Sequence, residues 1–174
     1  MAGLAGCLAG AVVAPRGRRR SAPLPATRRL DVHALHTGER LSATYCRNGA
    51  YDSGALAEIN HVLRDWRSGD VHRIDPGLLD LLATLRGKAG GSAPFELISG
   101  YRSPATNAAL ASNSGGVARR SLHMEGMAAD VRLPGVDLAT LHREASAMRA
   151  GGVGLYTRSN FVHVDTGRVR YWGS

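Results

Sequence analysis

Polar and apolar residues alternate in two stretches near the start of the patterned part of the chain. Residues 29–35 and 39–46 both alternate, and Thr37-Gly38 between them is a turn sequence. A period of two is typical of strands that bury one face, so the two stretches predict a β-hairpin. A period of three to four follows over residues 53–67, and it predicts an amphipathic helix that ends before Gly69.

The rest of the pattern mixes short helices with short strands. Asp75-Pro76 predicts the start of a second helix that runs to about Arg86, because aspartate caps helices and proline suits their first turn. Further helices are predicted over residues 104–112 and 137–149. Short apolar stretches predict strands over residues 95–100, 128–133, 153–156, 161–165 and 169–172. We therefore expect an α+β fold in one domain, residues 29–174, with helices packed on a small antiparallel sheet.

Residues 1–28 have the composition of a signal-like leader followed by a disordered basic linker. The first 14 are apolar or small, too few to span a bilayer, and they lack the basic start of a signal peptide. We expect the true start to lie upstream of Met1 and the protein to be exported to the periplasm or cell envelope, without stable membrane insertion. Twin-arginine export is compatible with this expectation, and so is lipoprotein anchoring through Leu4-Ala5-Gly6-Cys7. A low-complexity leader without an address is the alternative.

The net charge of +8 comes mainly from this N-terminal segment. The first 30 residues carry six of the 22 basic side chains and none of the 14 acidic ones. Aromatic residues are not interleaved with these arginines as they are in single-strand binders, so we expect no nucleic-acid partner. The chain has two cysteines, Cys7 and Cys46, which argue against a disulfide framework and exclude a cysteine-rich zinc site. Any metal must therefore be bound by histidine and carboxylate.

A histidine and an aspartate alternate with valines in the predicted strand 161–165. His163 and Asp165 share one face of that strand, and the valines point to the other face, into the core. Asp130 lies in another predicted strand, and His123 precedes it across a glycine turn. Two histidines and one carboxylate are a ligand set for a zinc ion that keeps its fourth position open. The alternative is a pair of histidines at the edge of the core, hydrogen-bonded to carboxylates.

Hydrolysis at a zinc site needs a base near the attacking water and a cation near the developing oxyanion. Asp165 is the predicted base, because it shares a strand face with His163. Arg102 is the predicted oxyanion partner, because it follows the strand 95–100 and a strand end is a rigid platform for a site residue.

Four segments, in this order, resemble the murein endopeptidase K family of zinc peptidases, which is related to D-Ala-D-Ala carboxypeptidases and lysostaphin-type enzymes. They are Ser99-Gly100-Tyr101-Arg102-Ser103, Ser121-Leu122-His123 with Gly126, Ala128 and Asp130, the stretch Met148-Arg149-Ala150-Gly151-Gly152-Val153-Gly154, and residues 159–167. The similarity runs from about Leu30 to Trp172. It implies a fold like that of hedgehog and the D-Ala-D-Ala peptidases, a Zn²⁺ cofactor, and cleavage of peptide cross-links of peptidoglycan in the periplasm.

The resemblance also assigns roles to single positions. The zinc ligands of the family match His123, Asp130 and His163. Arg102 matches the arginine that stabilises the scissile carbonyl. Many of the related carboxypeptidases place an acid three residues before the last ligand, where this chain has Asn160. The base is therefore Asp165, Glu125 or another residue, and the alternative role for Asp165 is to orient a zinc histidine.

Residues and resemblance together predict a zinc-dependent murein endopeptidase, in which a metal-activated water attacks an amide in the peptide cross-links of peptidoglycan. Two alternatives stay open. One is a D,D-carboxypeptidase that trims peptidoglycan stem peptides. The other is a non-catalytic wall-binding module on the same fold, which Asn160 favours.

Overall fold

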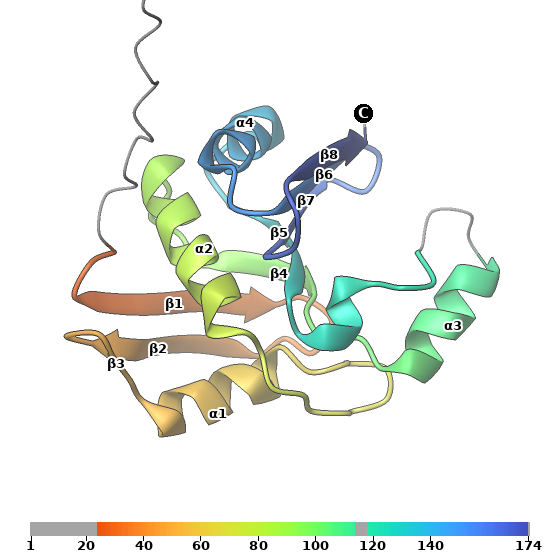
Figure 1. Ribbon diagram of the computed structural model, residues 1–174, viewed down its shortest axis with the longest axis horizontal. Helices are drawn as coiled ribbons and strands as arrows, with labels where there is room; N and C mark the ends of the chain where they lie inside the picture. Colours follow the sequence, from red (N-terminus) through yellow and green to blue (C-terminus); the bar gives the residue numbers. More distant parts are fainter. Residues whose placement is uncertain (1–23, 114–117, 174) are drawn as a thin grey trace, which may run out of the picture.

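The computed structural model describes residues 24–113 and 118–173, so most of the predicted leader lies outside the described residues. Eight strands form one sheet in the order β3-β2-β1-β4-β5-β7-β6-β8 (Figure 1). The strands are β1 (Thr27–Ala34), β2 (Arg40–Arg47), β3 (Ala50–Tyr51), β4 (Phe95–Ser99), β5 (Ala128–Arg132), β6 (Gly152–Tyr156), β7 (Phe161–Asp165) and β8 (Arg170–Gly173). The helices are α1 (Ser53–Val62), α2 (Pro76–Lys88), α3 (Pro104–Asn113) and α4 (Leu138–Met148), with a 3-10 helix η1 (Leu122–Glu125).

The α+β class agrees with the sequence prediction, but the sheet is larger than predicted and mixed rather than antiparallel. Strand β1 pairs in parallel with β4, and β6 pairs in parallel with β8. Helices α1 and α2 lie between β3 and β4 in the chain, and this long crossover brings β4 back beside β1 in the same direction. Periodicity identifies strands but does not specify their partners, so the prediction of a small antiparallel sheet was wrong.

Helices α1, α2 and α4 cover one face of the sheet and share a single core with it (Figure 1). Alternate residues of the strands point into this core, as a period of two requires. The fully buried members from the central strands include Ala129, Val162 and Val164, and those from the helices include Ile59, Leu78, Leu82 and Leu141. The other face of β5 and β7 carries polar side chains, and these build the site described below.

Helix α1 is shorter than the predicted 53–67, because the chain turns at Asp65. The carboxylate of this buried residue accepts a hydrogen bond from the backbone N–H of Arg67 at 3.0 Å and another from the N–H of Ser103 at 2.9 Å. An aspartate that binds backbone amides in this way stabilises a turn in place of a further helical turn. The same bonds tie residues 65–67 to the segment that follows β4.

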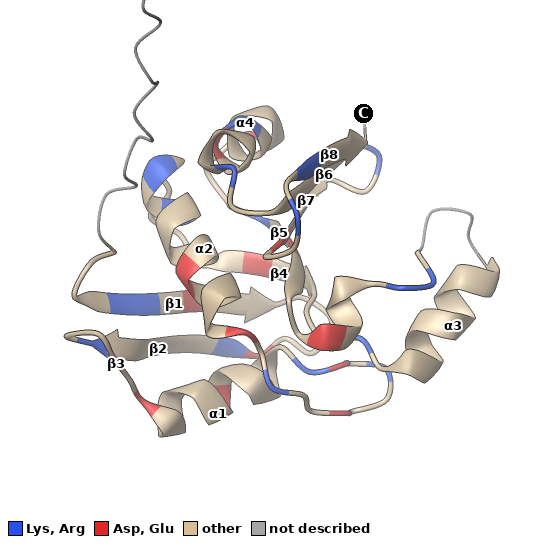
Figure 2. Cartoon of the chain, in the orientation of Figure 1, with Lys and Arg blue, Asp and Glu red and all other residues tan. Residues whose placement is uncertain are grey.

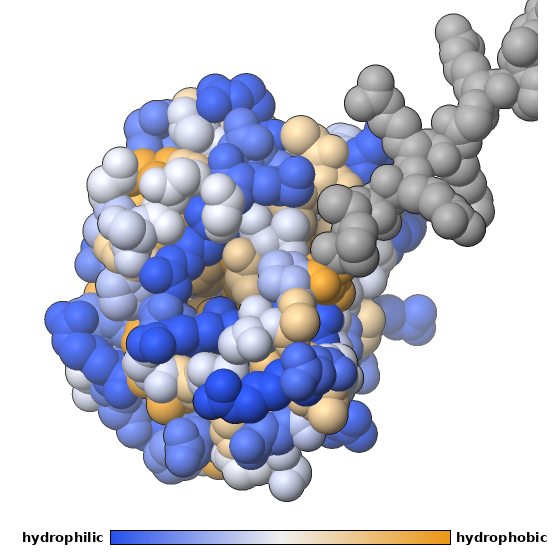
Figure 3. Space-filling model, turned by 90° about the vertical axis from the view of Figure 1, so that its left-hand side faces the viewer, coloured by the Kyte–Doolittle hydropathy of each residue, from blue (hydrophilic) through white to orange (hydrophobic). Residues whose placement is uncertain are grey.

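Basic and acidic residues are interspersed along most of the described elements (Figure 2). The face over β3 and the start of β1 is mostly hydrophilic, with apolar residues in small scattered groups (Figure 3). Among the described residues, no helix has the length and apolar character needed to cross a membrane.

Candidate metal centre

Two neighbouring strands place an aspartate and a histidine side by side. Strands β5 and β7 are antiparallel, and Asp130 is paired directly with His163. Paired residues of adjacent strands project from the same face of the sheet, so the two side chains meet. The flanking Ala129 and Val164 point to the other face and are fully buried in the core.

The 3-10 helix η1 brings His123 over these two residues. The helix ends at Gly126, whose φ of 66° lies in the left-handed region. A Cβ atom at this position would lie 2.2 Å from the carbonyl oxygen of Arg73, so only glycine fits the turn. The backbone N–H of Arg102 donates to the carbonyl oxygen of His123 at 3.1 Å and fixes the helix from the other side.

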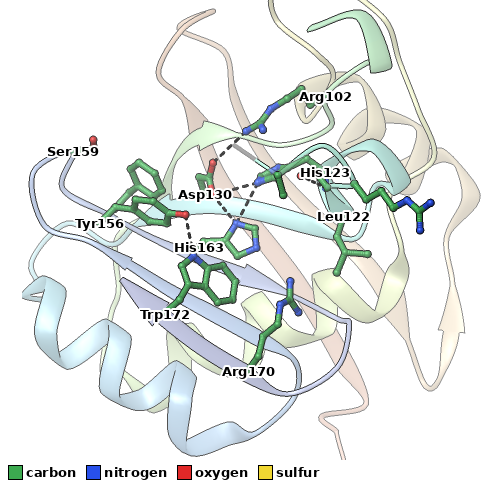
Figure 4. A pocket seen from close by; sticks show the side chains of 13 residues that line it. Arg102, Leu122, His123, Asp130, Tyr156, Ser159, His163, Arg170 and Trp172 are labelled. Carbon is green, nitrogen blue, oxygen red and sulfur yellow. Dashed lines mark hydrogen bonds and ion pairs between the residues drawn. The ribbon is translucent and has the colours of Figure 1, made fainter. Parts of the chain in front are cut away.

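Three side-chain atoms converge at this point (Figure 4). Nε2 of His123 lies 3.2 Å from Nδ1 of His163 and 3.3 Å from Oδ1 of Asp130. Nδ1 of His163 lies 2.9 Å from the same Asp130 oxygen. All three residues are buried, and one ion can contact all three atoms.

The outer hydrogen bonds of the two imidazoles show which ring nitrogens face inward. Nδ1 of His123 lies 2.7 Å from the carbonyl oxygen of Gly100, which only accepts, so this nitrogen carries the ring proton. Nε2 of His163 likewise lies 3.0 Å from Oδ2 of Asp165. The inward atoms are then Nε2 of His123, Nδ1 of His163 and a carboxylate oxygen of Asp130, and without a metal Nδ1 of His163 shares a proton with that carboxylate. Three acceptors so close together need a cation between them.

The pKa values of Asp130 and His163 reflect the close approach of these side chains. Burial opposes ionisation of Asp130, but the charges and hydrogen bonds of His123 and His163 prevail and hold the pKa of that carboxyl well below its usual range. Burial opposes protonation of His163, but hydrogen bonds to Asp130 and Asp165 prevail and raise its pKa. A metal ion at this point replaces the proton that the carboxylates attract to the histidine.

Arg102 lies beside the metal-ligand candidates on the turn after β4. It is only 9% exposed, and its Nη2 atom lies 3.7 Å from Oδ2 of Asp130. Its other contacts are long, at 3.3 Å to Asn107 and 3.5 Å to Ser99, and its buried Nε has no hydrogen-bond partner among the described residues. Burial lowers the pKa of Arg102, although Asp130 opposes this effect. The guanidinium therefore has unused capacity to donate to an oxygen in the pocket.

Asp65 positions the turn that carries Arg102. Burial opposes ionisation of Asp65, but hydrogen bonds from Thr106, Ser103 and Arg67 prevail and lower its pKa to about 2. Because the folded pKa is depressed, the stabilisation is complete above the unfolded pKa near 3.9 and is lost as pH falls through about 2. The carboxylate thus stabilises the Arg102 turn at any pH above about 4.

We expect Asp65→Asn to lower the free energy of unfolding by about 2 kcal/mol at neutral pH, because the amide replaces a buried, charged acceptor of two backbone N–H groups. The difference from the parent protein should shrink between about pH 4 and pH 2, where the parent carboxyl gains its own proton. Urea unfolding at a series of pH values measures it. Asp70→Asn, at an exposed position in the same loop, should change stability little. A difference in the free energy of unfolding that stays constant with pH would contradict the lowered pKa of Asp65.

The two base candidates, Asp165 and Glu125, lie in different surroundings. Asp165 is fully buried, and its oxygens accept from the backbone N–H groups of Gly152 and Gly167 and from the guanidinium of Arg170. These bonds and the one to His163 outweigh burial and hold the pKa of Asp165 well below its usual range. Glu125 is exposed and does not line the pocket. Asn160 lies in the turn between β6 and β7, outside it.

An open pocket of about 410 Å³ lies over the three converging atoms. Its lining residues are Arg102, Ala118, Arg120, Ser121, Leu122, His123, Asp130, Tyr156, Ser159, Phe161, His163, Arg170 and Trp172. Asp130 is the one carboxylate among these described residues, against three arginines. The pocket therefore suits a substrate that carries negative charge.

Sequence reasoning missed Tyr156, Arg170 and Trp172 as residues of the pocket. They lie on β6 and β8, and the parallel pairing of these two strands brings them to the site. No local signal in the sequence predicts that pairing, because parallel partners have no tight turn that links them.

Comparison with known proteins places the chain in a family. The model of a family described as "Peptidoglycan L,D-endopeptidase MepK" matches residues 22–172. The peptidoglycan L,D-endopeptidase MepK of Escherichia coli strain K12 is 44% identical over 169 residues, which cover 97% of this chain and 93% of that protein. The probable peptidoglycan L,D-endopeptidase MepK of Haemophilus influenzae is 38% identical over 170 residues, 97% of this chain and 91% of that protein. No solved structure matches. The chain therefore belongs to the MepK family of peptidoglycan L,D-endopeptidases.

Proposed function

We propose that this protein is a zinc-dependent endopeptidase that hydrolyses an amide in the peptide cross-links of peptidoglycan. The observation that carries the proposal is the convergence of two imidazole nitrogens and a carboxylate oxygen under an open pocket. Membership of the MepK family supports the choice of substrate. The family relation also supports a fold like that of the D-Ala-D-Ala peptidases. The proposed domain begins near residue 29, after an N-terminal leader.

The three ligand atoms fit zinc. Zn²⁺ binds nitrogen and carboxylate oxygen at about 2.0–2.1 Å, so neighbouring ligands of a tetrahedral ion lie roughly 3.3–3.4 Å apart. The observed separations of 2.9, 3.2 and 3.3 Å are close to this value. His123, Asp130 and His163 would hold the ion and leave its fourth position toward the pocket. When bound, zinc lowers the pKa of a water molecule and polarises a carbonyl group.

The surrounding residues orient the ligands and receive the charge that develops in the substrate. Gly100 and Asp165 accept the outer ring protons of His123 and His163, and so fix which nitrogen faces the pocket. Arg102 has donors available near Asp130, and we propose that it binds the oxyanion of the scissile amide.

We assign Asp165 the role of orienting His163 rather than that of general base. Both of its oxygens already accept hydrogen bonds, and the residue is fully enclosed. Glu125 is also a poor candidate for the base, because it does not line the pocket.

Asp165→Asn is expected to weaken zinc binding by about 10- to 100-fold, because the amide no longer attracts the proton of His163 Nε2 as a carboxylate does. Competition with a chromophoric chelator measures the affinity. Asp137→Asn, which changes an exposed cap of α4 far from the pocket, is the control. If Asp165 acted as the base instead, the variant would bind zinc normally and lose only turnover.

The proposed substrate lies in the cell envelope, and we propose that the protein is exported to the periplasm, by a twin-arginine route or as a lipoprotein.

The proposed activity is tested by digestion of purified muropeptide dimers. We expect the protein to split dimers joined by an L,D-type cross-link into monomers, to leave D,D-linked dimers intact, to stop after chelation and to recover with zinc. Mass spectrometry identifies the products. Removal of a terminal alanine with the cross-link intact would instead indicate the carboxypeptidase, and binding without any product would indicate the wall-binding module.

A further inference from the structure

A tyrosine hydroxyl lies in the pocket, and its proton has no hydrogen-bond acceptor among the described residues. Tyr156 is the last residue of β6, and its hydroxyl oxygen accepts a hydrogen bond from Nε1 of Trp172 at 2.9 Å. Both residues line the pocket. A phenol has one proton to donate in addition to the lone pairs that accept. Among the described residues no acceptor for this proton is found.

The tyrosine is held in place by its neighbours. Its ring stacks on that of Phe161, with centroids 4.6 Å apart. Trp172 packs closely over Gly154, where a Cβ atom would lie 2.6 Å from the indole nitrogen. The indole also lies 5.1 Å from the ring of His163, and the guanidinium of Arg170 covers it at 4.8 Å. A donor held this rigidly loses little freedom when it binds a substrate.

The hydroxyl of Tyr156 points toward the metal-ligand candidates. Figure 4 shows the Tyr156 hydroxyl directed toward Asp130 and His163 from the wall that Trp172 forms. Arg102 reaches Asp130 from another side in the same view. The indole N–H occupies one lone pair of the phenol oxygen, so the phenol proton is left to point into the pocket.

We propose that Tyr156 is a further catalytic residue, which donates a hydrogen bond to the oxyanion formed from the scissile amide, and that Trp172 positions it. This inference rests on the proposed endopeptidase function. It gives the oxyanion a neutral donor in addition to the cationic donor Arg102. The bond strengthens as negative charge builds on the oxygen, so it acts mainly on turnover and little on substrate binding.

The test is Tyr156→Phe in the zinc-loaded protein, with L,D-linked muropeptide dimers as substrate. We expect kcat to fall roughly tenfold to a hundredfold and KM to change by less than about threefold. Zinc content and melting temperature should equal those of the parent. A phosphinate analogue of the scissile amide should bind more weakly to the variant by a similar factor, whereas an uncleaved substrate peptide should not.

Tyr171→Phe is the matched control. Tyr171 is exposed, and its hydroxyl donates to the backbone oxygen of Ser146, so the same atom is lost outside the pocket. This variant should keep the parent values of kcat and KM.

Trp172→Phe tests the positioning role, because it keeps an aromatic ring and removes the indole donor. We expect a smaller fall in kcat at nearly constant KM, and no further fall when the change is added to Tyr156→Phe. The chain has two tryptophans, so their indole N–H signals are readily assigned by NMR. Tyr156→Phe should shift the signal of Trp172 and leave that of Trp66 unchanged.

The outcomes separate this inference from the function on which it rests. If the parent protein hydrolyses no dimer, the endopeptidase proposal fails. If the parent is active and Tyr156→Phe retains kcat within about twofold, the catalytic role of Tyr156 is overturned. Loss of zinc or of folding in Tyr156→Phe would also overturn it, because the role would then be structural.

Discussion

Replacing His123 or His163 by alanine is expected to lower kcat/KM for cross-linked muropeptides by at least about a thousandfold. Each change removes one of three converging ligand atoms, and a bound metal contributes several kcal/mol to the transition state of amide hydrolysis. The apolar core lies on the opposite face of β5 and β7, so the fold should persist. Turnover assays measure the fall in kcat/KM, metal analysis shows the effect of the lost ligand atom, and circular dichroism shows whether the fold persists.

His61→Ala is the control for these variants. The side chain of His61 is 59% exposed and lies 3.5 Å from Glu39 at the surface, so the metal content and activity should match those of the parent. Full activity in His123→Ala or His163→Ala would show that hydrolysis does not depend on the proposed ligands.

The second large effect is expected at Arg102. Arg102→Ala should lower kcat by about 10²- to 10³-fold with a small change in KM, because the lost donors act on the oxyanion of the transition state. Arg102→Lys should restore only part of the rate, since an ammonium lacks the planar fork of donors. Zinc affinity should stay close to that of the parent, because the guanidinium is no ligand.

Arg143→Ala is the matched control, because its side chain is 65% exposed on α4. An Arg102→Ala variant with unchanged kcat and raised KM would contradict the proposed role and indicate simple substrate binding.

The metal-ligand candidates could be predicted from the sequence because strand periodicity carries the needed geometry. His163 and its valine neighbours alternate, and the valines are buried in the core as expected. Asp130 lies on a second apolar strand. The structure pairs these two predicted strands, and their register brings the side chains of Asp130 and His163 together.

Other features depended on contacts between distant segments. The end of α1 is set by hydrogen bonds from Asp65 to Ser103, which are 38 residues apart in the chain. The surroundings of Asp165 likewise include Arg170 and the backbone of Gly152, and these contacts bury a carboxylate that looks available in the sequence. A residue type indicates which chemistry a side chain can supply. Its partners in the fold determine which of its hydrogen-bonding groups remain available to a substrate.

The most direct test of the account is the position of the metal in crystals of the zinc-loaded protein. An anomalous difference map recorded at the zinc absorption edge should show one peak for each chain, in contact with Nε2 of His123, Oδ1 of Asp130 and Nδ1 of His163. The side of the metal ion that has no protein ligand should face the pocket that Arg102 and Tyr156 line. A peak elsewhere, or hydrolysis of cross-linked muropeptides by protein shown to contain no metal, would contradict the account.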